Sequence, residues 1–275
     1  MKILVLGSAG QIGAPACKYL REQGHEVIEY DIKDDINYDL RYDNLLRTLS
    51  SAIKKCDFVY YLASDVGGAK YLEKNEHSYK FIENNMLMMC NVFHHLDYYK
   101  KPFIFTSSQM ADLHHSTYGM LKLLGEKMTN DIGGLVVRLW NVYGPEHDEE
   151  KSHVITDFCK MAKYQGVINM RTNGDESRQL LYVEDCAEAL LTLTDQYDTL
   201  DKTKPYHITS FKWTSIKEVA GIIHNIHGGR MGMKWSSMTD QTQMNAMNPP
   251  DPYILNFWEP KTSLEEGIRK IYESC

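Results

Sequence analysis

Several patterns that mark common classes of protein are missing from this sequence. Its six cysteines are scattered, with no C-x-x-C pair and no Cys/His cluster at metal-ligand spacing. No stretch approaches the roughly 20 apolar residues of a membrane span, and the apolar run after Met1 is too short for a signal peptide. We therefore expect a cytoplasmic protein with reduced thiols, no bound metal and no membrane partner.

Basic residues form no run, and the formal net charge of the 275 residues is −7. Because nucleic-acid surfaces are basic, we expect no nucleic-acid partner. Hydrophobic residues make up 43% of the chain and charged residues 24%, which is typical of a soluble globular protein. A chain of this length can bury a full hydrophobic core.

The first half of the sequence alternates short apolar runs with longer amphipathic segments. The apolar runs predict strands buried on both faces, at 2–7, 26–31, 56–64, 102–108 and 134–144, the last of which runs into a loop. Amphipathic spacing predicts helices at 11–24, 43–55, 78–100 and 116–131. Strands that alternate with helices pair in parallel, so this α/β pattern predicts a Rossmann-like, doubly wound parallel sheet.

After Gly144 the pattern loosens, and the rest of the chain shows no sheet pattern of its own. A polar loop is expected at 238–254, and Ser263 with Glu266 forms a capping-box signature. Helices are predicted at 155–166, 183–196, 214–229 and 262–274, and one more strand near 205–210. We thus expect a first domain, residues 1–144 plus that strand, and a smaller C-terminal lobe, residues 145–275.

The stretch GSAGQIG directly follows the first predicted strand and opens the first helix. Its glycines, Gly7, Gly10 and Gly13, permit a tight turn and let the backbone approach a pyrophosphate, which a helix N-terminus attracts. Asp31 ends the second strand, where an acid binds a ribose diol and repels a 2′-phosphate. This favours NAD over NADP in the first domain, although Lys33 lies near; a tight turn without a ligand is the alternative.

Tyr118 and Lys122 lie one helical turn apart, in the helix that follows the strand at 102–108. Ligands of such sheets bind at the carboxyl ends of strands, and an i, i+4 pair shares one helix face. A neighbouring ammonium and a positively charged nicotinamide lower the pKa of a phenol from its usual value of about 10. We predict that Tyr118 exchanges a proton with a sugar hydroxyl during hydride transfer, helped by Ser108 or Ser107; an ordinary surface pair is the alternative.

These residues belong to a longer set of motifs that covers nearly the whole chain. The sequence resembles the extended short-chain dehydrogenase/reductase family, in its NAD-dependent nucleotide-sugar epimerase/dehydratase branch. The resemblance rests on GSAGQIG (7–13), YLAS (61–64), FIFTSS (103–108), YGMLK (118–122), RLWNVYGP (138–145), RQLLYVEDCAEAL (178–190) and SLEEGI (263–268). The combination is specific for this branch and much less specific for a reaction.

The resemblance implies a role for individual residues. Ser108, Tyr118 and Lys122 would be catalytic, and Arg178 would pair with the diphosphate of a nucleotide sugar. Beside the three glycines and Asp31, the cofactor would contact Gln11, Ile12, Asp39, Leu40, Leu62, Ala63, Ser64, Asn85, Tyr118 and Lys122, with Asp39 and Leu40 flanking adenine. The substrate would contact Gly67, Gly68, Ser107, Ser108, Gln109, Asn141 and Arg178.

The segment SDVGG (64–68) looks like the one after the third strand in GDP-mannose 3,5-epimerases and GDP-fucose synthases, which favours a GDP-linked sugar; a flexible loop is the alternative. Gln109 and Met110 stand where those enzymes carry an acid/base cysteine, which disfavours 3,5-epimerisation. The adjacent Asp–Glu of the 4,6-dehydratases is also missing. Only nine residues separate Ser108 from Tyr118, and this short loop holds His114 and His115, as a substrate acid/base or as solvated side chains.

The remaining catalytic residues suffice for hydride transfer at one carbinol, C4 of a hexose or heptose, with Tyr118 moving the proton. We predict an NAD-dependent nucleotide-sugar epimerase/oxidoreductase. The alternatives are a 4-dehydrogenase or 4-keto reductase that releases its product, a reductase on a non-nucleotide substrate, and a regulator that only binds NAD. The helices at 78–100 and 116–131 resemble the pair that forms a four-helix dimer interface in this family, so a homodimer is expected.

Overall fold

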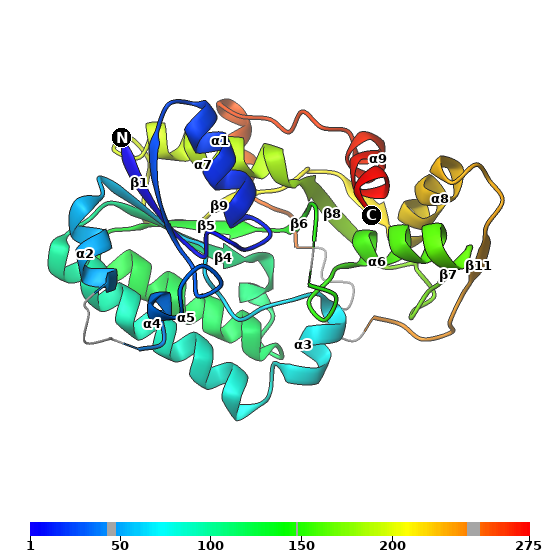
Figure 1. Ribbon diagram of the computed structural model, residues 1–275, viewed down its shortest axis with the longest axis horizontal. Helices are drawn as coiled ribbons and strands as arrows, with labels where there is room; N and C mark the ends of the chain where they lie inside the picture. The colour runs from blue at the N-terminus through cyan, green and yellow to red at the C-terminus, as the bar shows by residue number, and fades with distance from the viewer. Residues whose placement is uncertain (43–47, 147, 241–247) are drawn as a thin grey trace.

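A six-stranded parallel sheet forms the centre of the protein (Figure 1). The structure, a computed structural model, describes residues 1–42, 48–146, 148–240 and 248–275. The strand order across the sheet is β2 (Glu26–Tyr30), β1 (Lys2–Leu6), β3 (Phe58–Tyr61), β4 (Phe103–Ser108), β5 (Leu135–Leu139) and β9 (Tyr206–Ile208). Every pairing between neighbours in this order is parallel. The predicted doubly wound α/β sheet is confirmed.

Helices cover both faces of this sheet, because its strands are apolar on both sides. One face carries α1 (Gly13–Glu22) and α7 (Val183–Asp195), which contact each other. The other carries α2 (Thr48–Lys55), α4 (Tyr79–Tyr99) and α5 (Thr117–Asp131) (Figure 1). Alternate strand residues enter two separate cores, so that Ile3 and Val5 pack on one side while Leu4 and Leu6 pack on the other.

The point at which the strand order changes direction positions the site. β2 lies on one side of β1 and β3 on the other, so the chain winds outward both ways from β1. In sheets of this kind a crevice forms at the carboxyl ends of the two strands that flank the change. Gly7 follows β1 and Leu62 follows β3, so both segments that sequence motifs marked for the cofactor begin there.

The C-terminal lobe contains sheets that the sequence did not reveal, and the expectation that it has none is wrong. A three-stranded sheet has the order β10 (Trp213–Ser215), β8 (Ser177–Tyr182) and β6 (Asn141–Tyr143). A two-stranded sheet pairs β11 (Gly232–Lys234) with β7 (Val167–Asn169). Four of these five strands have only three residues, too few to display an alternating pattern. The segment 134–144, predicted as a strand that runs into a loop, likewise contains two strands, β5 and β6, in different sheets.

The predicted helices of the lobe are present as α6 (Val154–Lys160), continued by the π-helical turn η3 (Met161–Gln165), α8 (Ile216–Ile226) and α9 (Leu264–Ser274). Ser263 caps α9 by accepting a hydrogen bond from the amide of Glu266. Elements not predicted are α3 (Ala69–Asn75) and the 3-10 turns η1 (Ile36–Tyr38), η2 (Gln109–Asp112) and η4 (Pro252–Asn256). Parts of the predicted helix at 43–55 and loop at 238–254 lie outside the described residues. Among the residues described, every helix falls short of the length and apolarity that crossing a bilayer requires.

Candidate active site

The glycine turn at the end of β1 has a geometry that side chains would block. Gly7 has φ +90°, a conformation that favours glycine, and a Cβ there would lie 2.8 Å from the backbone nitrogen of Ala63. A Cβ on Gly13 would lie 2.0 Å from the carbonyl oxygen of Gly7. Because Gly7 and Gly13 have no side chains, three backbone segments can lie close together: the end of β1, the start of α1, and the segment after β3.

Asp31 is held beside this turn, as the sequence predicts. One carboxylate oxygen accepts a hydrogen bond from the amide of Ala9 at 3.1 Å, and the other accepts one from the amide of Lys33 at 2.9 Å. Leu62 donates its amide to the carbonyl of Leu6 at 3.0 Å. Cofactor residues predicted from three separate segments thus meet at one crevice.

Unpartnered polar atoms show what kind of group fits the turn. Two buried polar atoms have no hydrogen-bond partner in the described part of the chain: the Ser8 hydroxyl and the Gln11 side-chain amide nitrogen. Ser8 is only 3% exposed. Helix α1 starts with no side-chain cap and no acidic residue in its first turn. Free donors at a helix N-terminus suit an anionic group such as a pyrophosphate. The residues present therefore fit a dinucleotide.

The residues predicted to flank adenine lie close together after η1. Asp39 is bound by the Arg41 guanidinium, with Nη2 2.6 Å from a carboxylate oxygen. Burial raises the pKa of Asp39, but the hydrogen bonds and charge of Arg41 outweigh it and hold that pKa below its usual value. Leu40 is buried, and its carbonyl accepts a hydrogen bond from Asn91. Their contact with adenine stays a prediction.

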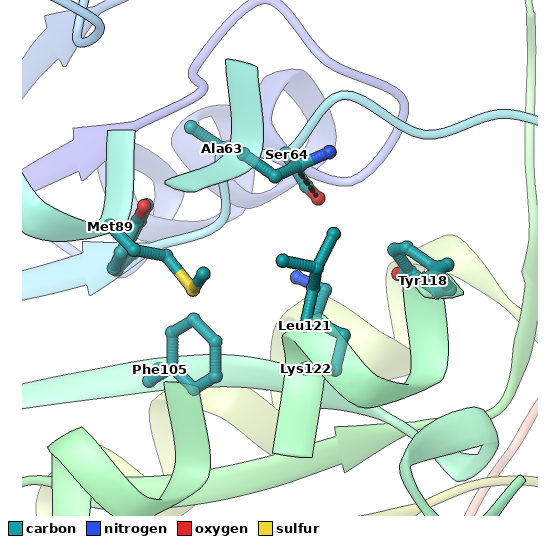
Figure 2. A pocket seen from close by; sticks show the side chains of 9 residues that line it. Ala63, Ser64, Met89, Phe105, Tyr118, Leu121 and Lys122 are labelled. Atoms are coloured by element: carbon teal, nitrogen blue, oxygen red, sulfur yellow. Dashed lines mark hydrogen bonds between the residues drawn. The ribbon is translucent and has the colours of Figure 1, made fainter. Parts of the chain in front are cut away.

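A pocket beside the end of β3 brings together the predicted residues of the nicotinamide end. Figure 2 shows Ala63 and Ser64 across it from Tyr118 and Lys122 on α5. Asn85 also lines it, together with the apolar residues Tyr61, Met89, Phe105 and Leu121, which the sequence did not single out. The pocket therefore has the tyrosine–lysine pair on one side and, on the other, Ala63, whose backbone lies against Gly7 of the glycine turn.

Tyr118 is buried against Ser108 rather than exposed on the surface. The residue is 8% exposed, and Ser108 is the hydrogen-bonding side chain that acts on the pKa of its phenol. Burial raises the pKa of the phenol above its usual value, and the bond to Ser108 offsets this only in part. The expectation that Lys122 lowers this pKa is therefore not met in the chain alone, because desolvation dominates.

Lys122 lies one turn further along the same face of α5. Its ammonium donates to the carbonyl of Thr106 at 2.8 Å and lies 5.6 Å from the centre of the Tyr118 ring. Burial lowers the pKa of Lys122 from 10.5 to about 7, against an opposing effect of the nearby Glu126 carboxylate. The lysine can therefore gain or lose its proton near neutral pH.

The lowered pKa of Lys122 makes stability depend on pH in a defined direction. Burying the charged Lys122 ammonium lowers the free energy of unfolding, and this cost is present in full below pH 7. Between pH 7 and 10.5 the unfolded chain binds more protons at this residue than the folded chain does, so the cost is lost as the pH rises through that window. We expect Lys122→Met to remove that dependence. The melting temperature of the parent should therefore rise relative to the variant between pH 7 and 10.

Lys127→Met, an exposed lysine on the same helix, is the matched control. Its melting-temperature difference from the parent should stay flat across the same pH range. A flat difference for Lys122→Met as well would contradict the lowered pKa.

The two serines at the end of β4 lie in different surroundings. Consecutive strand residues point to opposite faces, so Ser108 meets Tyr118 while the Ser107 hydroxyl donates to Glu126 at 2.5 Å. Ser107 is buried with the ion pair of Glu126 and Arg138. Its hydroxyl is thus engaged by Glu126 in this structure, and its contact with substrate and its role as the alternative catalytic serine stay predictions.

Asn85 organises the loop that follows β3. Its carbonyl oxygen accepts from the Ser64 hydroxyl at 3.0 Å and from the Asp65 amide at 2.9 Å, and its amide donates to the Asp65 carbonyl. Asp65 in turn pairs with Lys151 at 2.9 Å. Asn85 thus fixes one wall of the pocket, and Asp65 ties that wall to the C-terminal lobe.

Gly67 and Gly68 give room to protein backbone in this structure. A Cβ on Gly68 would lie 2.2 Å from the carbonyl oxygen of Ser152, and one on Gly67 would lie 3.0 Å from the Cα of Lys151. The amide of Gly68 donates to the Lys151 carbonyl at 2.9 Å. The close neighbours are therefore the segment 151–152 and, at Gly67, the Tyr71 side chain at 2.9 Å, and the contact of these glycines with a sugar stays a prediction.

Sequence reasoning missed the residues that hold the start of α5. The buried carboxylate of Glu76 accepts from the Ser116 hydroxyl at 2.7 Å and from the amide of Tyr118 itself at 3.1 Å. His77 lies 2.6 Å from the Thr117 hydroxyl. Ser116 also caps the helix by accepting from the Gly119 amide. No sequence motif includes Glu76, so only the fold reveals that it positions Tyr118.

The predicted substrate residues of the lobe lie on adjacent strands. Asn141 on β6 pairs with Leu180 on β8, two residues from Arg178. The Asn141 side-chain oxygen is buried and has no partner within the described ranges. Asn141 also follows β5, whose Leu139 pairs with Ser108, so β5 leads from the catalytic serine to this sheet. Arg178 forms a buried ion pair with Asp240.

The remaining predicted residues lie in the short connection between β4 and α5. Gln109 begins the 3-10 turn η2 and is half-buried, whereas His114 and His115 are exposed. Glu146 and His153, at 2.5 Å, form a further carboxylate–imidazole pair in the lobe that the sequence did not indicate. Over the described ranges, no group of three or more His, Cys, Asp or Glu side chains could hold a metal ion.

Comparison with known proteins adds to this geometry. The model of the NAD dependent epimerase/dehydratase family matches residues 3–209. GDP-mannose 3,5-epimerase 1 of Oryza sativa subsp. indica is 24% identical over an alignment of 318 residues, which covers 99% of this chain and 81% of that protein.

Two solved structures show the same fold over nearly their full length. UDP-glucose 4-epimerase of Thermotoga maritima, with UDP-glucose, has a TM-score of 0.83 at 20% identity, covering 99% of this chain and 98% of its own. The GDP-mannoheptose C4 reductase of Campylobacter jejuni, with NADP bound, has a TM-score of 0.81 at 18% identity, covering 99% and 97%. At these identities the likeness establishes the fold and leaves the reaction open.

Proposed function

This chain belongs to the NAD dependent epimerase/dehydratase family, and on that premise we propose that it is a nucleotide-sugar epimerase that transfers a hydride at C4 of the sugar. One observation carries the proposal: Tyr118 and Lys122 line a single pocket beside the end of β3. That strand ends next to the glycine turn, so the acid/base group and the cofactor crevice adjoin.

The cofactor would be held by the residues that meet at the crevice. The amides at the start of α1 and the side chains of Ser8 and Gln11 would bind the pyrophosphate, and Asp31 would bind the adenosine ribose. Ser64 and Lys122 would contact the nicotinamide end. Bound there, NAD supplies a ring that accepts and returns a hydride.

Tyr118 would handle the proton that accompanies the hydride. As the phenolate, Tyr118 would accept the C4 hydroxyl proton as hydride leaves C4, and the phenol so formed would return that proton when the ketone is reduced. Ser108 would hydrogen-bond the same sugar oxygen. A charged Lys122, at 5.6 Å from the ring, would favour the phenolate, and burial keeps water from competing.

The C-terminal lobe would bind the nucleotide diphosphate. Arg178 offers a guanidinium to the phosphate oxygens, and Asn141, two residues along the neighbouring strand, offers a buried oxygen without a partner in the described structure, which could accept from a sugar hydroxyl. A GDP-linked sugar is favoured by the segment SDVGG and by the likeness to a GDP-mannose epimerase. The arrangement also suits the alternatives of a 4-dehydrogenase or a 4-keto reductase, which need the same residues and differ in releasing their product.

Two further predictions accompany this proposal. A homodimer is supported by exposed apolar residues on the adjoining helices α4 and α5, namely Tyr79, Tyr98, Met120 and Leu124 (Figure 1). Cytoplasmic location remains a prediction from the scattered, free cysteines.

The proposal is tested by purifying the protein, identifying its bound cofactor, and offering a panel of GDP- and UDP-sugars without added cofactor. An epimerase should convert a sugar to its C4 epimer with no net change in NADH absorbance. Accumulation of a 4-keto sugar with stoichiometric NADH would identify a dehydrogenase instead. A requirement for NADPH would identify a reductase, and retained NAD with no turnover of any sugar would favour a regulator.

A further inference from the structure

The arginine proposed for the diphosphate is already engaged by a carboxylate of the same chain. Arg178 donates through Nη2 to Asp240, and through Nη1 to the carbonyl of Ser177 at 2.8 Å. The side chains of Arg178 and Asp240 are 13% and 10% exposed. A pair this well buried is weakly screened by salt, so Asp240 offsets most of the positive charge that Arg178 offers.

Backbone pairing in the lobe brings Asp240 to this position. β11 pairs with β7, and the chain beyond β11 continues along the segment that leads to β8. The amide of Ser236 donates to the Thr172 carbonyl at 3.3 Å, and the amide of Asn173 donates to the Met238 carbonyl at 2.8 Å. These backbone hydrogen bonds therefore help to position Asp240 beside Arg178, in addition to the contact between the two side chains.

We infer that Asp240 sets the affinity of this site for nucleoside diphosphates, by placing an internal anion on the arginine that their phosphates need. This inference rests on the proposed function, in which Arg178 binds the diphosphate. Asp240 should weaken diphosphate binding whether it stays in place or moves when the ligand binds. If Asp240 stays, it repels the phosphate oxygens; if it leaves, the ligand must first break an ion pair.

Binding measurements test the inference without a known sugar. GDP and UDP are titrated calorimetrically into the full chain with excess NAD present, so that the glycine turn is occupied. Asp240→Asn keeps the size of the side chain and removes its charge, and we expect it to bind GDP or UDP about tenfold more tightly, a change worth about 1.4 kcal/mol. Because the pair is buried and weakly screened, the gain should persist at high ionic strength.

Asp175→Asn is the matched control, since Asp175 pairs with Lys217 in the same lobe but at an exposed position. It should leave both affinities unchanged. Melting temperatures, recorded alongside, establish that each variant is folded at the temperature of titration. Asp240→Asn with unchanged or weaker diphosphate binding would overturn the inference.

Arg178→Gln separates this outcome from failure of the proposed function. If Arg178→Gln weakens GDP or UDP binding while Asp240→Asn does not strengthen it, the role of Arg178 stands and the inference about Asp240 is wrong. If neither the parent nor Asp240→Asn binds either nucleotide, both the diphosphate role of Arg178 and the inference fall.

Discussion

Tyr118→Phe should lose sugar turnover by about a thousandfold while the protein keeps its cofactor. The substitution removes only the oxygen that carries the proton, and general acid–base catalysis by a positioned side chain contributes typically 10²–10⁴-fold. The ring would remain packed beside Phe81 and below the Lys122 ammonium. Turnover is measured with the sugar that the panel identifies, and retained NAD by the absorbance of nucleotide released on denaturation.

Tyr60→Phe supplies the control for removing a buried phenol oxygen. Tyr60 is fully buried on β3, and its hydroxyl lies 2.8 Å from that of Thr194, on the face of the sheet away from Tyr118. We expect a loss of about 1 kcal/mol in stability from the missing hydrogen bond and ordinary turnover. Turnover by Tyr118→Phe within tenfold of the parent would show that another group moves the proton.

The parts of the fold that the sequence predicted are those with long, continuous signals. Strands such as β1 and β4 are apolar at successive positions and stand between amphipathic helices, which is the signature of a parallel sheet. The glycine turn and the tyrosine–lysine pair were found because each is a local pattern attached to a predicted strand end. The family resemblance drawn from those motifs is confirmed by the match over residues 3–209.

The parts that it missed depend on contacts between distant segments. Glu76 binds the amide of Tyr118 from 42 residues away, and nothing in its local sequence marks it. Only the packing of α5 against β4 shows which side chain each serine meets: Ser107 contacts Glu126, and Ser108 lies beside Tyr118. The partner of Arg178 lies 62 residues further along the chain and reaches it through strands too short to predict.

The electrostatics of the site were also beyond local reasoning. A phenol and an ammonium one turn apart are expected to favour each other's charged forms. In the folded chain both are buried, and desolvation raises the pKa of Tyr118 and lowers that of Lys122. Whether burial or the neighbouring charge dominates depends on the packing around the pair, which the sequence does not display.

Gly13→Ala should lose cofactor binding, because the added methyl group has no space. Its Cβ would lie 2.0 Å from the Gly7 carbonyl oxygen, so the glycine turn or the start of α1 must shift. Overpacking of this kind costs about 1–3 kcal/mol, and the same shift would displace the amides proposed to bind the pyrophosphate. We expect NAD affinity, measured by calorimetry on cofactor-free protein, to fall by about tenfold to a hundredfold.

Gly221→Ala is the control, because at that position in α8 the same methyl group meets no atom of the described residues within 4 Å beyond its own helical turn. Alanine is more favourable than glycine in a helix by about 0.5–1 kcal/mol, so this variant should melt slightly higher and bind NAD normally. The contrast separates a lack of space at the turn from a general effect of replacing glycine. If Gly13→Ala binds NAD as the parent does, the pyrophosphate does not lie on this turn, and the assignment of Ser8, Gln11 and Asp31 to the cofactor fails with it.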